Sequence, residues 1–384
     1  MSERPQVLLV AVGGYGNIYL KEMTEHDVGA DIAGICEVMP DIEEKFPVIR
    51  EKGIPVYHTL DAFYQEHKAD LAIMASPIQF HTEMSLTCLK NGSNVLCEKP
   101  LCLHEEEAER MAEAAAEAGK FLAVGYQLNY QRDVLALKKD ILAGRFGAPK
   151  RLQVVHAMRR GAKYYARNNW AGHITAGGRE VLDSPFNNAC AHNFQMLTFL
   201  LGKDMPSACN VERVDAELYR ANPNVENYDT AALRFHMENG AEVLYYTTHA
   251  LKTKNLGPIG RMEFEHATVT YAPGKPGYQA ELEDGTVIDY GQIAPGERLQ
   301  KLYDCLECVK HGGTPSCGIP AEIPHIRAVR LVQQTPILPV NPALVETWSD
   351  EDDTYRSIRD IEDIFQKSAA QWKLPREAGF RLEV

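Results

Sequence analysis

The stretch Gln6–Tyr19, QVLLVAVGGYGNIY, constrains the fold of this chain more than any other part of the sequence. The apolar run Val7–Val12 is followed at once by Gly13, Gly14 and Gly16, and then by a segment compatible with a helix. The order of strand, tight glycine turn and helix is what a dinucleotide-binding fold needs at its first βα junction. A pyrophosphate would lie at the helix N-terminus, where unpaired N–H groups and the helix dipole favour negative charge.

The residues around this turn indicate which dinucleotide would bind. Aligned with G-x-G-x-x-G, the turn has Ala11 at its first position, Gly13 where the backbone must approach the pyrophosphate, and Gly16 where the helix packs against the strand. A second apolar run, Asp31–Cys36, ends in Glu37. A carboxylate at this strand tip can bond the ribose 2′-OH and repels a 2′-phosphate, so we expect NAD rather than NADP. A solvated turn carboxylate is the alternative interpretation of Glu37.

Composition narrows the class of protein. Hydrophobic residues make up 45% of the chain and charged residues 24%, a balance typical of globular enzymes. The net charge of −13 argues against a nucleic-acid or anionic-membrane surface, because both need clustered Lys and Arg. We see no apolar run of membrane-spanning length and no signal-peptide layout in the N-terminal MSERPQ. We therefore expect a cytoplasmic protein, and its 384 residues suggest two domains.

The nine cysteines are scattered along the chain. Cys305 and Cys308 form a C-x-x-C pair on an expected helix, which supplies half a zinc site at most. We therefore expect free thiols in a reducing compartment and no bound metal.

Strand and helix patterns alternate through the first third of the chain. After Glu37, strands are expected at 55–58, 71–75, 94–97 and 122–126, and helices at 42–52, 60–67, 83–90 and 105–118. This alternation predicts a doubly wound parallel sheet, or Rossmann domain, over residues 1–126. Ligands bind beyond the carboxyl ends of such strands. The loops concerned are 13–16, 37–39, 76–81, 98–100 and 126–130.

Two of these loops carry reactive side chains. Ser76-Pro77 ends one strand, and His81 is expected to project from the loop that follows. Glu98 and Lys99, followed by proline, end another strand. The ammonium of Lys99 can donate to a substrate hydroxyl and stabilise an alkoxide. An ion pair that merely seals the strand end is an equally good interpretation of the bare sequence.

The Ala-x-Gly-x-x-Gly turn, the Ser-Pro loop with His81, and above all the segment VLCEKPL at 95–101 resemble the Gfo/Idh/MocA family, which includes glucose–fructose oxidoreductase and inositol dehydrogenase. The resemblance covers nearly the whole chain. It implies a C-terminal α/β domain with a large, mainly antiparallel sheet, a bound nicotinamide cofactor, hydride transfer at a secondary alcohol of a sugar or cyclitol, and a catalytic role for Lys99. Residues assigned to the cofactor are Gly13, Gly14, Tyr15, Gly16, Glu37, Ser76, Pro77, His81, Glu98, Lys99 and Gln127.

The second domain is expected over residues 127–384. Its strands are expected at 151–159, 207–218, 230–236, 241–250, 260–271 and 286–290, and its helices at 133–143, 185–201, 297–310, 320–334 and 355–373. Asn239-Gly240 and Asp284-Gly285 indicate hairpin turns. In the family, the open face of the sheet commonly makes a dimer or tetramer contact, so the resemblance implies a homo-oligomer.

Substrate residues are expected in two segments of this domain. Tyr165 and Trp170 lie in a polar-aromatic cluster that suits a sugar ring, although a domain-interface cluster is the alternative. Asn188 and His192 are four apart on the helix expected after Pro185, hence on one face. The family typically carries an Asp and a His four apart here. The resemblance therefore assigns His192 as the base and leaves Asn188 in the place of the Asp.

A rival alignment counts forward from Gly177-Gly178 without a gap. It places Asp183 on the family's Asp and Asn187 where the His should be. Either way, one member of the family's pair is missing or displaced.

Three functions follow as hypotheses. The first is an NAD-dependent oxidoreductase acting on a sugar, cyclitol or glycoside, with Lys99, His192 and Asn188 as catalytic residues. The second is a glycoside-cleaving enzyme that oxidises the sugar transiently, eliminates the glycosidic bond and restores the cofactor. The third is a non-catalytic NAD-binding regulator that binds a protein partner.

Overall fold

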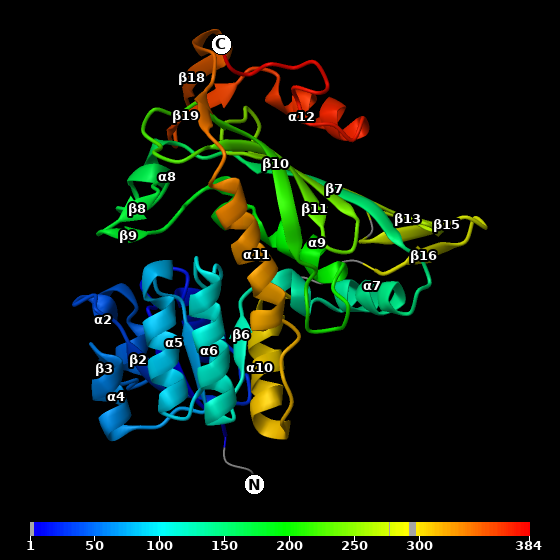
Figure 1. Cartoon of the computed structure of the whole chain (residues 1–384). Coiled ribbons are helices and arrows are strands. Elements are labelled where there is room, and N and C mark those ends of the chain that lie inside the picture. The colour runs from blue at the N-terminus through cyan, green and yellow to red at the C-terminus, as the bar shows by residue number, and fades with distance from the viewer. Residues whose placement is uncertain (1–3, 276, 292–296) are drawn as a thin grey trace. The chain divides into compact units, whose positions relative to one another are not determined.

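The chain forms two compact units in the computed structural model, which describes residues 4–275, 277–291 and 297–384. The N-terminal unit consists of Met1–Tyr130 with Pro295–Glu322, and the C-terminal unit of Gln131–Ala294 with Ile323–Val384 (Figure 1). Each unit has its own sheet and its own hydrophobic core.

The N-terminal unit is built on a six-stranded sheet of order β3-β2-β1-β4-β5-β6. All of its strand pairs are parallel, which confirms the predicted doubly wound sheet. The sequence runs outwards from β1 to β3 and from β4 to β6, so the order reverses between β1 and β4, where such folds bind ligands. The strands are β1 (Gln6–Val10), β2 (Asp31–Cys36), β3 (Val56–Tyr57), β4 (Leu71–Met74), β5 (Asn94–Cys97) and β6 (Leu122–Val124).

Helices connect these strands. They are α1 (Asn17–Glu25), α2 (Ile42–Lys45), α3 (Val48–Glu51), α4 (Leu60–Glu66), α5 (His81–Lys90), α6 (Glu105–Ala118) and α10 (Gln300–His311), with 3₁₀ turns η1 (Ile78–Phe80), η2 (Gln127–Tyr130) and η4 (Glu297–Leu299). The helix expected over 42–52 is instead two short helices, because Pro47 lacks the N–H that a continuous helix needs. α6 keeps its expected bounds, with three acids in its first turn and Gly119 in the left-handed region at its C-cap.

The expected division into residues 1–126 and 127–384 differs from these units. η4 and α10 belong to the N-terminal unit, although they follow the second sheet in sequence. The reason is packing. Leu299, Leu302, Cys305 and Leu306 lie in the same buried cluster as the apolar residues of β1 and β4.

The C-terminal unit is built on a nine-stranded sheet of order β16-β15-β14-β13-β7-β12-β11-β10-β17. Its strands are β7 (Pro149–Met158), β10 (Val211–Arg220), β11 (Thr230–Met237), β12 (Glu242–Thr248), β13 (Asn255–Phe264), β14 (Ala267–Tyr271), β15 (Gln279–Leu282), β16 (Val287–Asp289) and β17 (Ile337–Pro339). β7 with β12 and β10 with β17 are parallel pairs, and the other pairs are antiparallel. The expected large, mainly antiparallel sheet is therefore confirmed.

The remaining elements surround this sheet. The helices are α7 (Arg132–Leu142), α8 (Ala162–Ala166), α9 (Ala191–Leu200), α11 (Ile319–Val332) and α12 (Ile361–Ala370), with a π turn η3 (Pro185–Ala189) and a 3₁₀ turn η5 (Pro342–Leu344). Two small hairpins are β8 (Thr175–Ala176) with β9 (Arg179–Glu180), and β18 (Val345–Ser349) with β19 (Thr354–Ile358). Gly240 and Gly285, both at positive φ, turn the predicted hairpins.

Three predictions in this unit were wrong in detail. The helix expected over 355–373 is a strand, β19, followed by α12, because the chain reverses at Asp360, whose φ is 59°. The strand expected over 260–271 is divided between β13 and β14, which pair with each other as a hairpin. The helix expected over 185–201 is the π turn η3 followed by α9.

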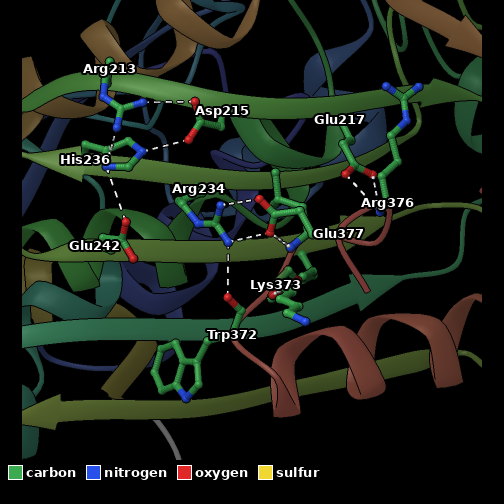
Figure 2. Close-up of polar contacts among 12 residues, drawn as sticks. Arg213, Asp215, Glu217, Arg234, His236, Glu242, Trp372, Lys373, Arg376 and Glu377 are labelled. Carbon is green, nitrogen blue, oxygen red and sulfur yellow. Dashed lines mark hydrogen bonds and ion pairs between the residues drawn. The ribbon is translucent and has the colours of Figure 1, made fainter. Parts of the chain in front are cut away.

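The C-terminal segment that follows α12 is tied to the nine-stranded sheet by polar contacts (Figure 2). Arg234 on β11 donates to both carboxylate oxygens of Glu377, at 2.6 and 2.7 Å, and to the carbonyl of Trp372 at 3.2 Å. The Tyr246 hydroxyl on β12 donates to the carbonyl of Lys373 at 2.8 Å. These contacts fix the segment on the sheet without adding a strand to it.

None of the helices in the described part of the chain has the length and apolar character needed to cross a bilayer. All nine cysteines are free thiols, as expected, and Cys308 is the least buried of them. Within the described residues, no group of three or more His, Cys, Asp or Glu side chains could hold a metal ion.

Candidate functional site

The glycine turn joins β1 to α1 in the N-terminal unit. Ala11 has a φ of 63°, the left-handed conformation that the usual glycine adopts without strain. A Cβ on Gly16 would lie 2.4 Å from the Ala11 carbonyl oxygen, so only glycine lets α1 start this close to β1. A Cβ on Gly14, by contrast, would meet no atom within 4 Å. The N-terminus of α1 has no capping side chain and no acid in its first turn. It is therefore suited to an anion.

Glu37 is buried at the tip of β2 and faces the glycine turn. Its Oε2 accepts the Gly13 N–H at 2.9 Å, and its Oε1 accepts the N–H groups of Val38 and Met39 at 2.8 and 3.2 Å. A Cβ on Gly13 would lie 3.0 Å from Met39 Cε, so the space around Gly13 is already filled on that side. These amides fix the carboxylate at the expected ribose position. A solvated turn carboxylate would be exposed, whereas Glu37 is not.

The Ser76–His81 loop contains one residue whose environment differs from expectation. The Ser76 hydroxyl is buried, and within the described residues it has no hydrogen-bond partner. Pro77 is exposed. His81 does not project from the loop: it is buried, with Nε2 2.7 Å from the Ser76 carbonyl oxygen and Nδ1 2.9 Å from that of Pro100. Burial lowers the pKa of His81. His81 thus links two loops, and the expectation of a projecting side chain was wrong.

Glu98 is held by a buried network. Its carboxylate accepts from the ammonium of Lys301 and from the Tyr19 hydroxyl, and Lys301 also donates to the Gly125 carbonyl at 3.1 Å. A Cβ on Gly125 would lie 2.8 Å from Glu98 Oε2, so glycine is required there. Burial and the Glu98 charge hold the pKa of Tyr19 well above its usual value. Because the carboxylate is committed to this network, Glu98 acts as an anchor for the loop that carries Lys99.

Lys99 is half-buried, and its backbone N–H donates to Glu98 Oε2 at 3.3 Å. Glu322, at the start of α11, is fully buried nearby, and its Oε1 accepts the Leu101 N–H at 3.3 Å. Burial raises the pKa of Glu322 to about 8, although the Leu101 amide, the charge of Lys99 and the Tyr126 hydroxyl partly oppose that rise. Gln127, at the start of η2, is half-buried.

Asn188 and His192 do not share one helix in the C-terminal unit. Asn188 lies in the π turn η3, and His192 lies in the first turn of α9. Both are half-buried. Asn188 Nδ2 donates to Asp183 Oδ1 at 2.7 Å, and Asp183 Oδ2 accepts the Gly172 N–H at 2.6 Å. The two alignments place either Asn188 or Asp183 at the position of the family's Asp. In the structure these two side chains are hydrogen-bonded to each other. Asn187 is buried, and its Nδ2 donates to the Leu182 carbonyl.

Aromatic and cationic side chains gather at the end of β7, around α8. Tyr164 and Tyr165 make edge contacts with each other and with His249, at centroid distances of 5.2 to 6.4 Å. Arg167 stacks on Tyr164 at 3.7 Å and lies 5.1 Å from the ring of Trp170. The expected cluster thus exists.

Three residues that make contacts in these sites were not predicted from the sequence. Lys301 could have been noticed as a lysine on the apolar face of α10, beside Leu302 and Cys305. His249 follows the apolar strand β12 directly, which is where polar site residues commonly lie. Arg160, whose guanidinium lies 4.7 Å from the centroid of the Tyr164 ring, follows β7 after one residue.

Comparison with known proteins decides the family. Residues 6–126 match the oxidoreductase family with an NAD-binding Rossmann fold, and residues 134–269 match the Gfo/Idh/MocA C-terminal domain. The chain belongs to the Gfo/Idh/MocA oxidoreductase family. The resemblance expected from the Glu-Lys-Pro segment is therefore confirmed, and the N-terminal unit carries the family's NAD-binding domain.

Curated relatives in this family include inositol dehydrogenases. The chain is 30% identical to inositol 2-dehydrogenase of Rubrobacter xylanophilus over 149 residues, which are 38% of this chain and 42% of that protein. It is 23% identical to scyllo-inositol 2-dehydrogenase (NAD(+)) of Bacillus subtilis over 336 residues, 82% of this chain and 89% of that protein. Several other matched relatives, from Klebsiella and Burkholderia, are aligned over 55 to 64% of their own length.

Solved structures share the fold. The WlbA dehydrogenase from Bordetella pertussis, in complex with NADH and UDP-GlcNAcA, aligns with a TM-score of 0.70 at 21% identity, covering 86% of this chain and 96% of that one. An oxidoreductase from Agrobacterium radiobacter, in complex with NAD+, L-tartaric acid and magnesium, aligns with a TM-score of 0.68 at 18% identity, over the same shares of each chain.

The residues of the N-terminal unit fit NAD. Gly14 leaves open space beside the uncapped N-terminus of α1, which suits the pyrophosphate. The buried Glu37 carboxylate suits a ribose hydroxyl and disfavours a 2′-phosphate. The buried Ser76 hydroxyl is a polar group whose partner a ligand could supply.

Proposed function

We propose that this protein is an NAD-dependent oxidoreductase that transfers hydride at a secondary hydroxyl of a sugar, cyclitol or glycoside. The observation that carries the proposal is the buried network of Glu98 with Lys301 and Tyr19. It fixes the Lys99 loop at the carboxyl end of β5, where ligands of such sheets bind. The alternative interpretation, an ion pair that merely seals the strand end, is weakened because the Lys301 ammonium already supplies Glu98 with a counter-ion.

Each catalytic residue has a defined task in this proposal. Lys99 donates to the reacting hydroxyl and stabilises the negative charge that develops on its oxygen. His192 takes the hydroxyl proton as general base, or returns it in the reverse direction. Asn188 orients the substrate or His192, with its amide fixed by the Asp183 carboxylate at 2.7 Å. NAD, when bound, accepts the hydride from the carbinol carbon.

Asp183 can supply the negative charge that the family's Asp would provide near His192, although position 188 is occupied by an asparagine. The Asp183 charge is joined to the Asn188 amide by one hydrogen bond. If the Asn188 amide oxygen accepts from His192 during the reaction, this bond would link a proton held by His192 to the Asp183 charge. Tyr165 and Trp170 would pack against the apolar face of the ring.

The proposal extends to the setting of the protein. We infer a cytoplasmic homo-dimer or homo-tetramer formed through the nine-stranded sheet, in which the N-terminal unit binds the cofactor and the C-terminal unit the substrate. Nine free cysteines support a reducing compartment. Sedimentation analysis of the purified protein tests the oligomer directly, and a monomer at micromolar concentration would contradict it.

The test of the chemistry uses two substitutions, Lys99→Ala and His192→Ala. We expect both variants to bind NAD like the wild type and to lose at least about a hundredfold in kcat for NADH formation from a panel of polyols, sugars and glycosides. Lys52→Ala and His311→Ala, at exposed positions, serve as matched controls. Full turnover in either active-site variant would remove that residue from the mechanism.

The same assay separates the other two hypotheses. Cleavage of a glycoside with only catalytic amounts of NAD would identify redox-assisted elimination instead of net oxidation. NAD binding without turnover of any panel member, together with capture of a specific protein, would identify a regulator.

A further inference from the structure

The C-terminal unit contains an arginine–tyrosine cluster, formed by Arg160, Tyr164, Tyr165, Arg167 and His249, of which the proposed reaction uses Tyr165 alone. Its members come from the segments that follow β7 and β12 and from α8. The Arg160 guanidinium lies 4.7 Å from the centroid of the Tyr164 ring, and that of Arg167 lies 3.7 Å from it. Two cations therefore share one aromatic ring.

Among the described residues, neither Arg160 nor Arg167 forms an ion pair, although burial and, to a lesser extent, the Asp183 charge raise the pKa values of both tyrosines. The Arg160 guanidinium donates to the Arg159 carbonyl at 3.3 Å and to the Met158 sulfur at 3.8 Å, and its Nε is buried without a partner in the described part of the chain. The neighbouring Arg159, in contrast, forms an ion pair with Asp350. Arg167 likewise has no ion pair among the described residues. Unpaired guanidiniums are unusual in a chain with a net charge of −13.

His249 adds an acceptor beside these donors. It is buried, and its Nδ1 donates to the Met158 carbonyl at 2.8 Å. Burial and the charge of Arg160 lower the pKa of His249 to about 3, so the ring is neutral and its Nε2 can accept a hydrogen bond. Neutral His249 suits a hydroxyl, whereas Arg160 and Arg167 suit an anion.

Contacts connect the cluster to the residues of the proposed reaction. The Tyr165 ring packs against Gly172, where a Cβ would lie 2.9 Å from Tyr165 Cδ1. The Gly172 N–H donates to Asp183, and Asp183 accepts from Asn188. The arginines thus lie at one end of a continuous set of contacts whose other end is Asn188. A sugar ring that reaches Asn188 could place a substituent at the cluster.

We propose that the substrate is an acidic carbohydrate, whose carboxylate or phosphate group is bound by Arg160 and Arg167 while a neighbouring hydroxyl donates to His249. This inference rests on the proposed function and narrows its substrate class. Guanidinium groups bind carboxylates and phosphates through paired, charge-assisted hydrogen bonds, and burial strengthens such bonds. Stacking on Tyr164 orients both guanidiniums before the anion arrives, which lowers the entropic cost of binding.

Calorimetry on the full-length protein saturated with NAD tests this inference. The probes are D-glucose, its carboxylate D-glucuronate and a glucose phosphate, which share the ring and differ in charge. We expect at least one anion to bind about tenfold or more tightly than glucose, with a preference that weakens as salt is added. Arg160→Ala and Arg167→Ala should each remove most of this preference. Arg381→Ala, an exposed arginine of the same unit, should retain it.

The choice of variants keeps the result interpretable. Arg160 is partly buried, so its variant could lose stability, whereas Arg167 is exposed and its replacement leaves the fold intact. Tighter binding of glucuronate identifies a sugar acid, and tighter binding of the phosphate identifies a sugar phosphate. Equal binding of all three probes, failure of both anions to bind, or an anion preference that survives both arginine substitutions would overturn the inference.

A separate assay of NADH formation distinguishes this inference from the proposed function. Oxidation of neutral polyols without any anion preference would leave the oxidoreductase standing and remove the acidic substrate. Suppose instead that the protein binds an anion through Arg160 but reduces NAD with no member of the panel. That result would support the anion site and contradict the oxidoreductase.

Discussion

At the scale of single residues, two glycines of the same turn have different tasks. Gly16 is required by packing, because its α-hydrogen faces the Ala11 carbonyl, where a Cβ would be only 2.4 Å away. A Cβ on Gly14 would meet no atom within 4 Å, and we propose that this open space serves the approach of the cofactor. In the sequence pattern Gly16 is a fixed glycine and Gly14 is a variable position, and the structure agrees that packing requires glycine only at position 16.

Alanine substitutions measure this difference. We expect Gly16→Ala to lower the free energy of unfolding by about 1–3 kcal/mol, because the helix must shift to admit the methyl group. Gly14→Ala should stay within about 0.5 kcal/mol of the wild type and should weaken NAD binding instead. Urea unfolding monitored by circular dichroism checks both values. Equal destabilisation by the two substitutions would contradict the packing argument.

Glu322 makes stability depend on pH. Its pKa rises from 4.5 to about 8 on folding, chiefly through burial, so the folded state holds a proton that the unfolded state releases. Stability from this group is therefore fully present below pH 4.5, falls as pH rises from 4.5 towards 8, and is lost above it. The contribution to the slope is at most about 1.4 kcal/mol per pH unit.

The variant Glu322→Gln isolates this term, because the amide cannot ionise. We expect its free energy of unfolding to vary less than that of the wild type between pH 5 and 8, about the window set by the two pKa values. Parallel pH profiles of wild type and variant would show that Glu322 does not carry the dependence. Glu51→Gln, at an exposed position, is the control.

The positions of these residues are easier to predict from the sequence than their environments. Short local sequence motifs identify the glycine turn, Glu37 and the Glu-Lys-Pro segment. Their positions could therefore be predicted. His81 was placed on the correct loop, yet its ring is buried between the Ser76 and Pro100 carbonyls. The orientation of His81 depends on the Pro100 loop, which lies next to it in space but not in the sequence. Local sequence alone could not predict it.

At the scale of elements, α10 completes the N-terminal unit from a distant part of the chain. It covers the sheet with Leu302, Cys305 and Leu306, and it inserts Lys301 against Glu98. The expected domain boundary missed this, because the helix follows the second sheet in sequence and no local signal says which core an amphipathic helix covers. Helices with clear start and stop signals were easier to predict. For example, α6, between His104 and Gly119, has the bounds that were expected.

Removing the Lys301 ammonium tests the contribution of this helix. Lys301→Met leaves the Glu98 carboxylate buried without its counter-ion, and we expect a loss of about 3–5 kcal/mol in the free energy of unfolding. Adding Glu98→Gln to that variant should recover at least half of the loss, since no charge then remains buried. Denaturant unfolding of the single and double variants gives both values.

A control on the same helix sets the scale. Lys310→Met breaks the i,i+3 pair with Glu307, whose carboxylate is largely exposed, and should cost less than about 0.5 kcal/mol. A Lys301→Met variant as stable as Lys310→Met would show that the buried pair does not hold α10 in place.

Two ion pairs on the nine-stranded sheet should differ in how much stability is lost when each is removed (Figure 2). The Arg234 side chain is 14% exposed and binds Glu377 in a bidentate manner, whereas Arg213 is 63% exposed and binds Asp215. We expect Arg234→Ala to cost about 1.5–3 kcal/mol in the free energy of unfolding, and Arg213→Ala less than about 1 kcal/mol. Thermal unfolding of both variants tests the ranking. A larger loss for Arg213→Ala would show that the C-terminal segment is not fixed by Arg234.

At the scale of the whole molecule, the fold is that of the Gfo/Idh/MocA family, and both family domains are present. The fold accounts for the cofactor, because the glycine turn and Glu37 belong to the Rossmann scaffold. It does not choose the substrate, since one fold can carry sites of different chemistry. We propose instead that the substrate is selected by Arg160, Arg167 and His249, which no periodic pattern in the sequence reveals.

Isotope transfer tests the central claim, hydride transfer to NAD, most directly. The protein is incubated with NAD and with polyols and sugar acids that carry deuterium on their carbinol carbons, and the cofactor is analysed by mass spectrometry. We predict that deuterium reaches the nicotinamide ring with the wild type and not with Lys99→Ala. A wild-type protein that binds NAD yet transfers no deuterium from any of these compounds would contradict the account.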